Sequence, residues 1–151
     1  MTSKWSTVKL SDVCAIRYGK DYKKLNKGTI PVYGSGGVIY NVDKSIHNKK
    51  SVLIPRKGTL SNLFLVNPPF WTVDTIFWTD IDMQKILPEF LFYQLKTMDL
   101  ASRNVGTAVP SLTTSLLNDL MLVLPPISEQ KRLISLLIAF DSKIYINNMI
   151  N

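Results

Sequence analysis

Cysteine and histidine are almost absent from the chain, and this scarcity removes several classes of chemistry. The 151 residues contain one cysteine, Cys14, and one histidine, His47. A cysteine-based zinc cluster and an internal disulfide are therefore excluded, and no serine lies in a nucleophile-elbow motif. His47 lies in a polar run and Cys14 among apolar neighbours, so we expect a surface histidine and a buried thiol. We expect no catalytic activity and no metal or other cofactor in this chain.

Long hydrophobic runs are also missing. The longest apolar run near the C-terminus, Leu136–Phe140, is far shorter than the roughly 20 residues that a membrane-spanning helix needs. The first residues, Met1–Trp5, lack the apolar stretch of a signal peptide. We therefore expect a cytoplasmic protein without membrane contact.

Acidic residues are scarce in the first part of the chain. Residues 1–60 hold twelve Lys/Arg and three Asp, a net charge of +9. Residues 61–151 hold six Lys/Arg and eight Asp/Glu, a net charge of −2. This asymmetry predicts a phosphate-binding surface in the N-terminal part. The alternative is a solvated lysine face with no partner.

Short runs of β-forming residues separated by proline and glycine predict an α+β fold with mixed short strands. With 46% apolar residues, the chain can bury one sizeable core. The predicted strands are 8–10, 29–33, 38–40, 51–55, 63–66, 70–78 and 119–124. The predicted helices are 12–16, a helix that begins at 88, a short one at 113–117, and a terminal one.

The terminal helix has the pattern of a coiled coil. Pro125 and Pro126 end the preceding strand, and Ser128 is placed to cap the new helix. Apolar residues follow at spacings of 4, 3 and 4, at Leu133, Leu137, Phe140 and Ile144. We therefore expect a recognition domain at 1–124 and a spacer or dimerisation helix at 125–151.

Seven short motifs, in order along the chain, resemble the target recognition domain of a type I restriction-modification specificity subunit. They are Trp5–Val13, Ile30–Val38, Ile54–Thr59, Pro69–Thr75, Phe90–Leu95, Gly106–Leu112 and Leu124–Gln130. Each motif alone is weak, and their order makes the resemblance specific.

The resemblance implies a division of labour. Specificity subunits of this family perform no chemistry. Their recognition domains each read one half of a split double-stranded DNA target, and they dock methyltransferase subunits that carry S-adenosylmethionine. Restriction subunits join through the methyltransferase.

Family members usually carry two recognition domains, whereas this sequence has one. We therefore expect a half-sized subunit that forms a homodimer through its terminal helix. Two alternatives stay open: a truncated, incomplete specificity fragment, whose helix pairs with another specificity chain, and a non-catalytic RNA-binding or regulatory protein that uses the same basic surface.

Candidate contacts follow from side-chain chemistry. Arg56 and Lys57, at the end of a predicted strand, are the best candidates to read guanine. The candidate phosphate contacts are Lys20, Lys23, Lys24, Lys27, Lys49 and Lys50. Tyr33, Ser35 and Thr59 flank glycine turns, and Arg103, Thr107 and Ser111 belong to a second polar loop. For methyltransferase docking we expect exposed side chains at Glu129, Gln130 and Arg132.

Overall fold

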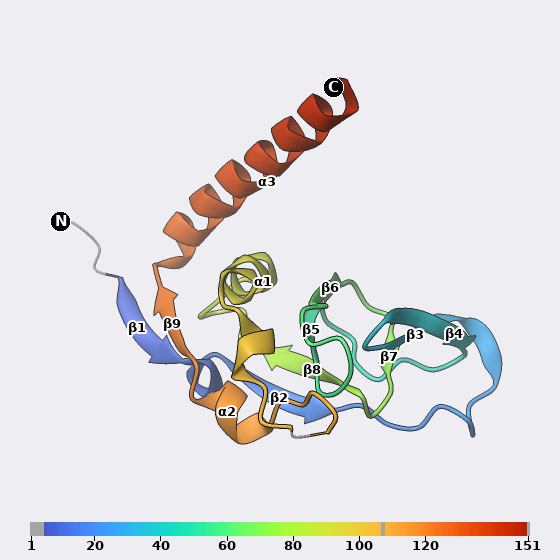
Figure 1. The fold of residues 1–151 in the computed structure, drawn as a ribbon. Coiled ribbons are helices and arrows are strands. Elements are labelled where there is room, and N and C mark those ends of the chain that lie inside the picture. The colour runs from blue at the N-terminus through green and yellow to red at the C-terminus, as the bar shows by residue number, and fades with distance from the viewer. Residues whose placement is uncertain (1–4, 107, 151) are drawn as a thin grey trace.

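The computed structural model describes residues 5–106 and 108–150, the side chains of 144–150 excepted. Short strands alternate with a few helices, and a long terminal helix stands apart from the rest (Figure 1). The strands are β1 (Ser6–Lys9), β2 (Cys14–Tyr18), β3 (Lys27–Gly34), β4 (Gly37–Val42), β5 (Ser51–Pro55), β6 (Phe64–Val66), β7 (Trp71–Thr72), β8 (Ile76–Ile81) and β9 (Met121–Leu124). The helices are η1 (Leu10–Asp12), α1 (Pro88–Thr97), η2 (Leu100–Arg103), α2 (Thr114–Asn118) and α3 (Ile127–Ile150). Within the described residues, no helix is long and apolar enough to cross a membrane.

The strands form three small sheets. The largest has the order β2-β8-β5-β6 and is antiparallel throughout. A second sheet, β4-β3-β7, contains one parallel pair, β3 with β7. In the third, β9 returns to pair with β1, so that both ends of the domain meet. The predicted α+β fold of mixed short strands is confirmed.

Strand β5 is the centre of the main core. All five of its residues are buried, as expected for a run of apolar, β-branched residues covered on both faces. Helix α1 lies against this sheet and buries Leu91 and Leu95 completely. Two smaller clusters lie further along: one around Phe70, the other around Trp71 in the β4-β3-β7 sheet.

Two predicted elements were wrong, and tertiary pairing explains both. The predicted helix at 12–16 is instead the short η1 followed by β2, because β2 pairs with β8 through Cys14↔Ile81 to Tyr18↔Phe77. The predicted strand 70–78 is interrupted by a turn at 73–75. There the amide of Ile76 donates to the carbonyl of Val73 over 3.2 Å, which closes the turn between β7 and β8.

The start of α3 also differs from the prediction. The helix begins at Ile127, and the amide of Gln130 donates to the carbonyl of Pro126 over 3.0 Å. Ser128 therefore lies inside the first turn rather than at the cap.

Gln130 was expected to be exposed, and this expectation is wrong because its side chain is completely buried. Its Nε2 donates to the carbonyls of Lys85 and Pro125, each over 2.9 Å, and its Oε1 accepts from the amide of Leu87 over 2.9 Å. These three bonds give both polar atoms of the buried side-chain amide a partner. They fasten α3 to the segment before α1.

We predict that Gln130→Ala lowers the free energy of unfolding by about 2–3 kcal/mol, because one buried and two part-buried backbone groups lose their partner. Urea unfolding measures the effect. The matched control is Lys131→Ala, at an exposed neighbouring position of the same helix, which should change stability by less than about 0.5 kcal/mol. Equal losses in the two variants would contradict an anchoring role for Gln130.

Candidate nucleic-acid interface

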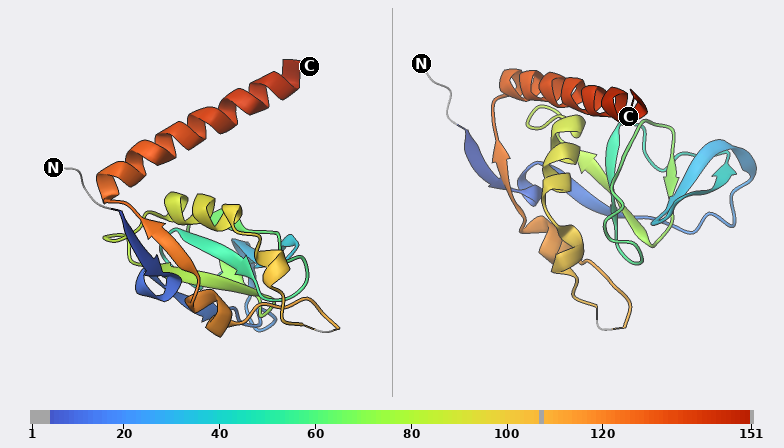
Figure 2. Two further views of the ribbon diagram at one scale, coloured as in Figure 1. Left: turned by 60° about the vertical axis from the view of Figure 1, so that its left-hand side comes forward. Right: turned by 45° about the horizontal axis from the view of Figure 1, so that its top comes forward.

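Several loops that are distant in sequence meet on one side of the domain. We call this surface the loop face and define it as residues 19–25, 34–37, 56–62, 73–75 and 104–111, Thr107 excepted. The amide Nδ2 of Asn62 donates to the carbonyl of Ser35 over 3.0 Å, and the amide of Gly58 donates to Pro110 over 3.4 Å. Figures 1 and 2 show the loop of residues 104–111 on the side of the domain opposite α3.

Two glycines allow the loops to approach so closely. Gly58 has φ +91°, a conformation that favours glycine, and a Cβ there would lie 2.7 Å from Oγ of Ser35. A Cβ at Gly19 would lie 1.9 Å from the carbonyl oxygen of Val73. The chain after Gly19 is held by the amide of Lys20, which donates to the carbonyl of Thr72 over 2.8 Å. Backbone contacts therefore set the positions of these loops.

A groove of about 620 Å³ runs between the loops. Lys23 lies on one side of it, Ser35 on the β3–β4 turn, and Asp74 on the turn before β8. The predicted candidates Lys20, Lys23 and Lys24 are all exposed in the adjoining loop. The groove itself is lined by one lysine, Lys23, and two carboxylates, Asp21 and Asp74, so the positive charge that would attract phosphates comes from the lysines of the adjoining loop.

The side chain of Arg56 is held by two contacts on the loop face. Its guanidinium Nη1 donates to the backbone carbonyl of Asp74 over 3.1 Å, and its Cζ lies 5.2 Å from the ring centroid of Tyr18. Lys57 is exposed beside it and forms an isolated β-bridge with Ser111. The sequence patterns identified Arg56, Lys57 and Ser111 but missed Tyr18, because a tyrosine at the end of a strand carries no functional signal alone.

The loop of residues 104–111 is shaped by a residue that the sequence patterns also missed. Oδ1 of Asn104 accepts from the amides of Gly106 and Ser111, over 2.7 and 2.8 Å. The only available sequence signal was the preference of asparagine for bonding its own backbone two residues onward. Arg103 is exposed just before this loop. Thr107, also predicted as a contact, lies outside the described residues.

Other predicted contacts are placed differently. Lys49 and Lys50 precede β5, whereas Arg56 follows it, so the two lysines lie at the opposite end of that strand. Lys50 forms an ion pair with Glu89 of α1. Lys27 is exposed at the start of β3, and Thr59 is exposed on the loop face. Tyr33 is half-buried, with its ring centroid 5.6 Å from that of Phe64.

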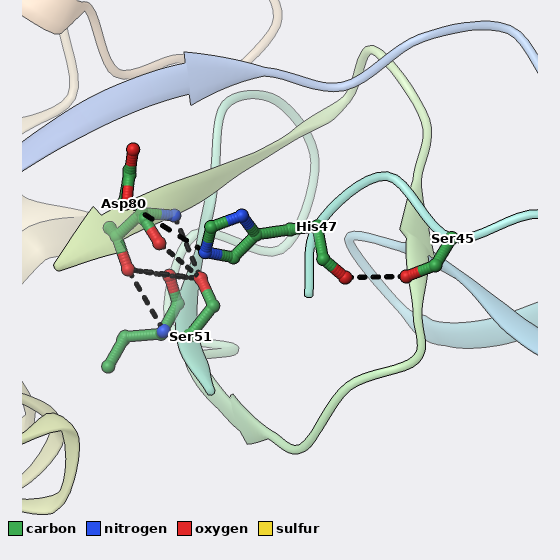
Figure 3. A network of polar contacts seen from close by, with 6 residues as sticks. Ser45, His47, Ser51 and Asp80 are labelled. Atoms are coloured by element: carbon green, nitrogen blue, oxygen red, sulfur yellow. Dashed lines mark hydrogen bonds and ion pairs between the residues drawn. The ribbon is translucent and has the colours of Figure 1, made fainter. Parts of the chain in front are cut away.

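The expectation that His47 is a surface histidine is wrong, because its side chain is only 10% exposed. Its ring packs against Trp78 at 4.5 Å between centroids, and Nε2 lies 3.9 Å from the carboxylate of Asp80 (Figure 3). Next to it, the hydroxyls of Ser51 and Thr79 bond each other and the strand backbones of β5 and β8. Burial lowers the pKa of His47, opposed in part by Asp80.

Cys14 is buried as expected, and desolvation raises the pKa of its thiol to about 12. A thiol with this pKa is protonated at neutral pH and is a poor nucleophile. Cys14 therefore serves as a small apolar group in the core.

The terminal helix leaves part of its apolar surface in water. Leu133 is half-buried against the domain core, so its packing is already supplied within the chain. Leu137 and Phe140 are 37% and 63% exposed, and the side chain of Ile144 is outside the described set. Arg132 is exposed as expected and pairs with Glu129 over 3.1 Å. Glu129 was also expected to be exposed, but it is half-buried because the first turn of α3 is held against the domain.

Comparison with known proteins identifies the family. Residues 2–151 match the model of the type I restriction modification DNA specificity domain. The chain belongs to this family. A Mycoplasma pneumoniae protein assigned as a type I specificity subunit is 26% identical over 147 residues, which cover 91% of the chain and 48% of the relative. The chain thus spans about half the length of this curated relative.

Solved structures have the same fold. The specificity subunit of M. genitalium matches with a TM-score of 0.76 and 17% identity, over 95% of this chain and 40% of that one. The specificity subunit of Thermoanaerobacter tengcongensis gives a TM-score of 0.74 and 17% identity, over 94% and 38% of the two chains. The predicted resemblance is confirmed as family membership, and the predicted fold class agrees with these neighbours.

We predict that His47 makes the protein less stable as the pH falls from 7 to 5. Its pKa is lowered in the folded state, so the unfolded chain, with an ordinary histidine pKa near 6.5, takes up the proton more readily. In His47→Gln the loss of stability between pH 7 and pH 5 should be smaller. The midpoints of urea unfolding of both proteins between pH 5 and 7 measure this loss. Between pH 7 and 8.5 the difference in stability between the two proteins should stay constant. Parallel profiles down to pH 5 would contradict the prediction.

Proposed function

We propose that this chain reads one half of a split double-stranded DNA target for a type I restriction-modification system and performs no chemistry itself. The observation that carries the proposal is the loop face, where a held arginine and exposed lysines lie on loops that meet beside a groove. Membership in the DNA specificity domain family supports the same reading.

Within the loop face, phosphate contacts and base contacts fall to different residues. Lys20, Lys23 and Lys24 extend from one loop and supply charge without sequence information. Arg56 carries in-plane N–H donors that match the O6 and N7 acceptors of guanine in the major groove. Lys57, Thr59 and Ser111 lie beside it and extend the reading surface.

Methyltransferase subunits dock on the other side of the molecule, at the start of α3, and bring the restriction subunits with them. The family relationship supports this partner. Glu129 and Arg132 are the proposed contact residues, while Gln130 serves the internal anchor. Because α3 lies opposite the loop face, DNA and methyltransferase occupy separate surfaces (Figure 2).

The exposed apolar face of α3 pairs with a second copy of the chain. Leu137 and Phe140 lie on the heptad-like seam and are 37% and 63% exposed, and Leu136, which flanks the seam, is 58% exposed. Apolar side chains left in water along a helix favour burial against another helix. A two-fold dimer presents two identical loop faces, which fits a target with inverted halves.

The DNA-binding proposal is tested by the salt dependence of binding to a short duplex, measured by fluorescence anisotropy. We expect binding at low salt, with log Kd linear in log salt concentration. Replacing Lys20, Lys23 and Lys24 by alanine together should reduce the slope by about 2 to 3, since each phosphate contact contributes about 0.9. Lys96→Ala, on α1 beneath α3, is the control and should leave the slope unchanged. Absence of binding at low salt, or equal slopes in all variants, would overturn the proposal.

Dimer formation is tested by light scattering coupled to gel filtration at about 10 μM. The wild-type chain should have the mass of a dimer, and Phe140→Glu should have that of a monomer, because a charge enters the apolar interface. Ser142→Glu, which lies two residues further on and so on another side of α3, should remain a dimer. A monomeric wild-type chain would instead assign the helix to pairing with a different chain.

A further inference from the structure

We propose that Tyr18 is a positioning residue that holds the guanidinium of Arg56 in place to read a guanine. The inference rests on the proposed function and adds to it a residue outside the recognised motifs. Three observations carry it: the fixed ring of Tyr18, the contacts of the Arg56 side chain, and the clamped backbone at Arg56.

The ring of Tyr18 is fixed although it is 52% exposed. Tyr18 ends β2, where it pairs with Phe77 of β8. The two rings meet edge to face at 5.2 Å between centroids, and Phe77 is almost completely buried. Nε1 of Trp78 also donates to the carbonyl of Tyr18 over 3.2 Å. One part of the ring thus rests on the core, while the rest forms a platform open to solvent.

Arg56 lies on this platform. Its Cζ is 5.2 Å from the centroid of the Tyr18 ring, within the distance of a cation–π contact. Nη1 donates to the backbone carbonyl of Asp74 over 3.1 Å, which restricts rotation of the guanidinium. This bond goes to a neutral carbonyl and does not neutralise the positive charge.

The backbone of Arg56 is clamped from both sides. Its amide donates to the carbonyl of Thr75 and its carbonyl accepts from the amide of Leu112, each over 2.9 Å. With the backbone fixed, Arg56 can move only by rotation about its side-chain bonds. The contacts with Tyr18 and Asp74 restrict these rotations.

The arrangement leaves the side chain able to bind a base edge. An arginine has five N–H donors in one plane, and a ring contact uses the face of that plane instead of its edge. One donor goes to Asp74, so the others stay available for a two-bond contact with O6 and N7 of guanine. A side chain that is already ordered loses less rotational freedom on binding. The contact with guanine therefore has a higher affinity and a better defined geometry.

The direct test of the contact uses NMR of the free chain. The ring current of Tyr18 should shift the Arg56 side-chain protons upfield in the wild type and in Tyr18→Phe, which keeps the ring. In Tyr18→Leu the shift should vanish while the backbone amide signals of β5 and β8 stay in place. Arg56 signals that are the same in all three proteins would overturn the inference.

The functional test measures base preference. The chain, assembled with its methyltransferase subunits, selects its target from a pool of random duplexes, and each variant is then compared at every base pair of that target. Arg56→Ala should relax the preference for guanine at one base pair by about 10-fold or more. Tyr18→Leu should relax it at the same base pair by about 2- to 5-fold, and Tyr18→Phe should match the wild type.

A double variant separates positioning from a general loss of structure. In the Arg56→Ala background, Tyr18→Leu should cause no further change in base preference, because its effect passes through Arg56. If Arg56→Ala relaxes one guanine and Tyr18→Leu does not, only the positioning role fails. If Arg56→Ala changes no base preference, the assignment of Arg56 as a reader fails, and the role of Tyr18 fails with it.

Discussion

The burial of β5 on both faces is the constraint on which the rest of the arrangement depends. Its five residues are all buried, and it pairs with β6 on one edge and β8 on the other. A slip of β5 by one residue would exchange every side chain between two packed faces and would break the bonds between Ser51 and Thr79 of β8. The residues just outside its ends are therefore fixed in space. Arg56 emerges at one end, and Lys50 meets Glu89 at the other.

A second constraint keeps the two working surfaces apart. The buried amide of Gln130 joins the first turn of α3 to the backbone at Lys85 and Leu87, and Ile134 packs into the same core. Further toward the C-terminus of α3, Asp141 accepts a hydrogen bond from the hydroxyl of Tyr93 of α1 over 3.0 Å. The helix thus leaves the domain on the side away from the loops (Figure 1). Binding at one surface need not obstruct the other.

The sequence predicted the parts of this molecule that local patterns encode. The strand at 51–55, the helix that starts at Pro88 and the long terminal helix all appear where periodicity and proline placed them. The residues it misjudged are set by tertiary contacts. Gln130 follows a proline pair at a helix start, which suggests exposure, yet three backbone groups from elsewhere surround it. His47 stands in a lysine-rich run, yet Trp78 covers its ring.

The candidate site shows the same division. Arg56 and Lys57 could be chosen from their type and their place after a strand, but Tyr18, 38 residues earlier than Arg56, meets it only because β2 and β5 both pair with β8. Asn104 and Gly58 likewise shape loops through contacts with Ser111 and Ser35, which lie too far along the chain for local spacing to reveal. Sequence patterns identify chemically able side chains, whereas the partners that orient them come from the topology.

This topology also suggests how such a surface can change its specificity without losing its fold. The loops of the loop face are held by backbone bonds, such as Gly58 to Pro110 and Leu112 to Arg56, and by the side-chain amides of Asn62 and Asn104 bonded to backbone groups. Exposed side chains such as Lys57 and Thr59 make no such contribution, so replacing them costs little stability. Arg56 stands between these two classes, since its backbone belongs to the scaffold and its side chain to the reading surface. Substitution of the side chain at position 56 can therefore change the base preference without disturbing the scaffold, provided that the new side chain fits over Tyr18.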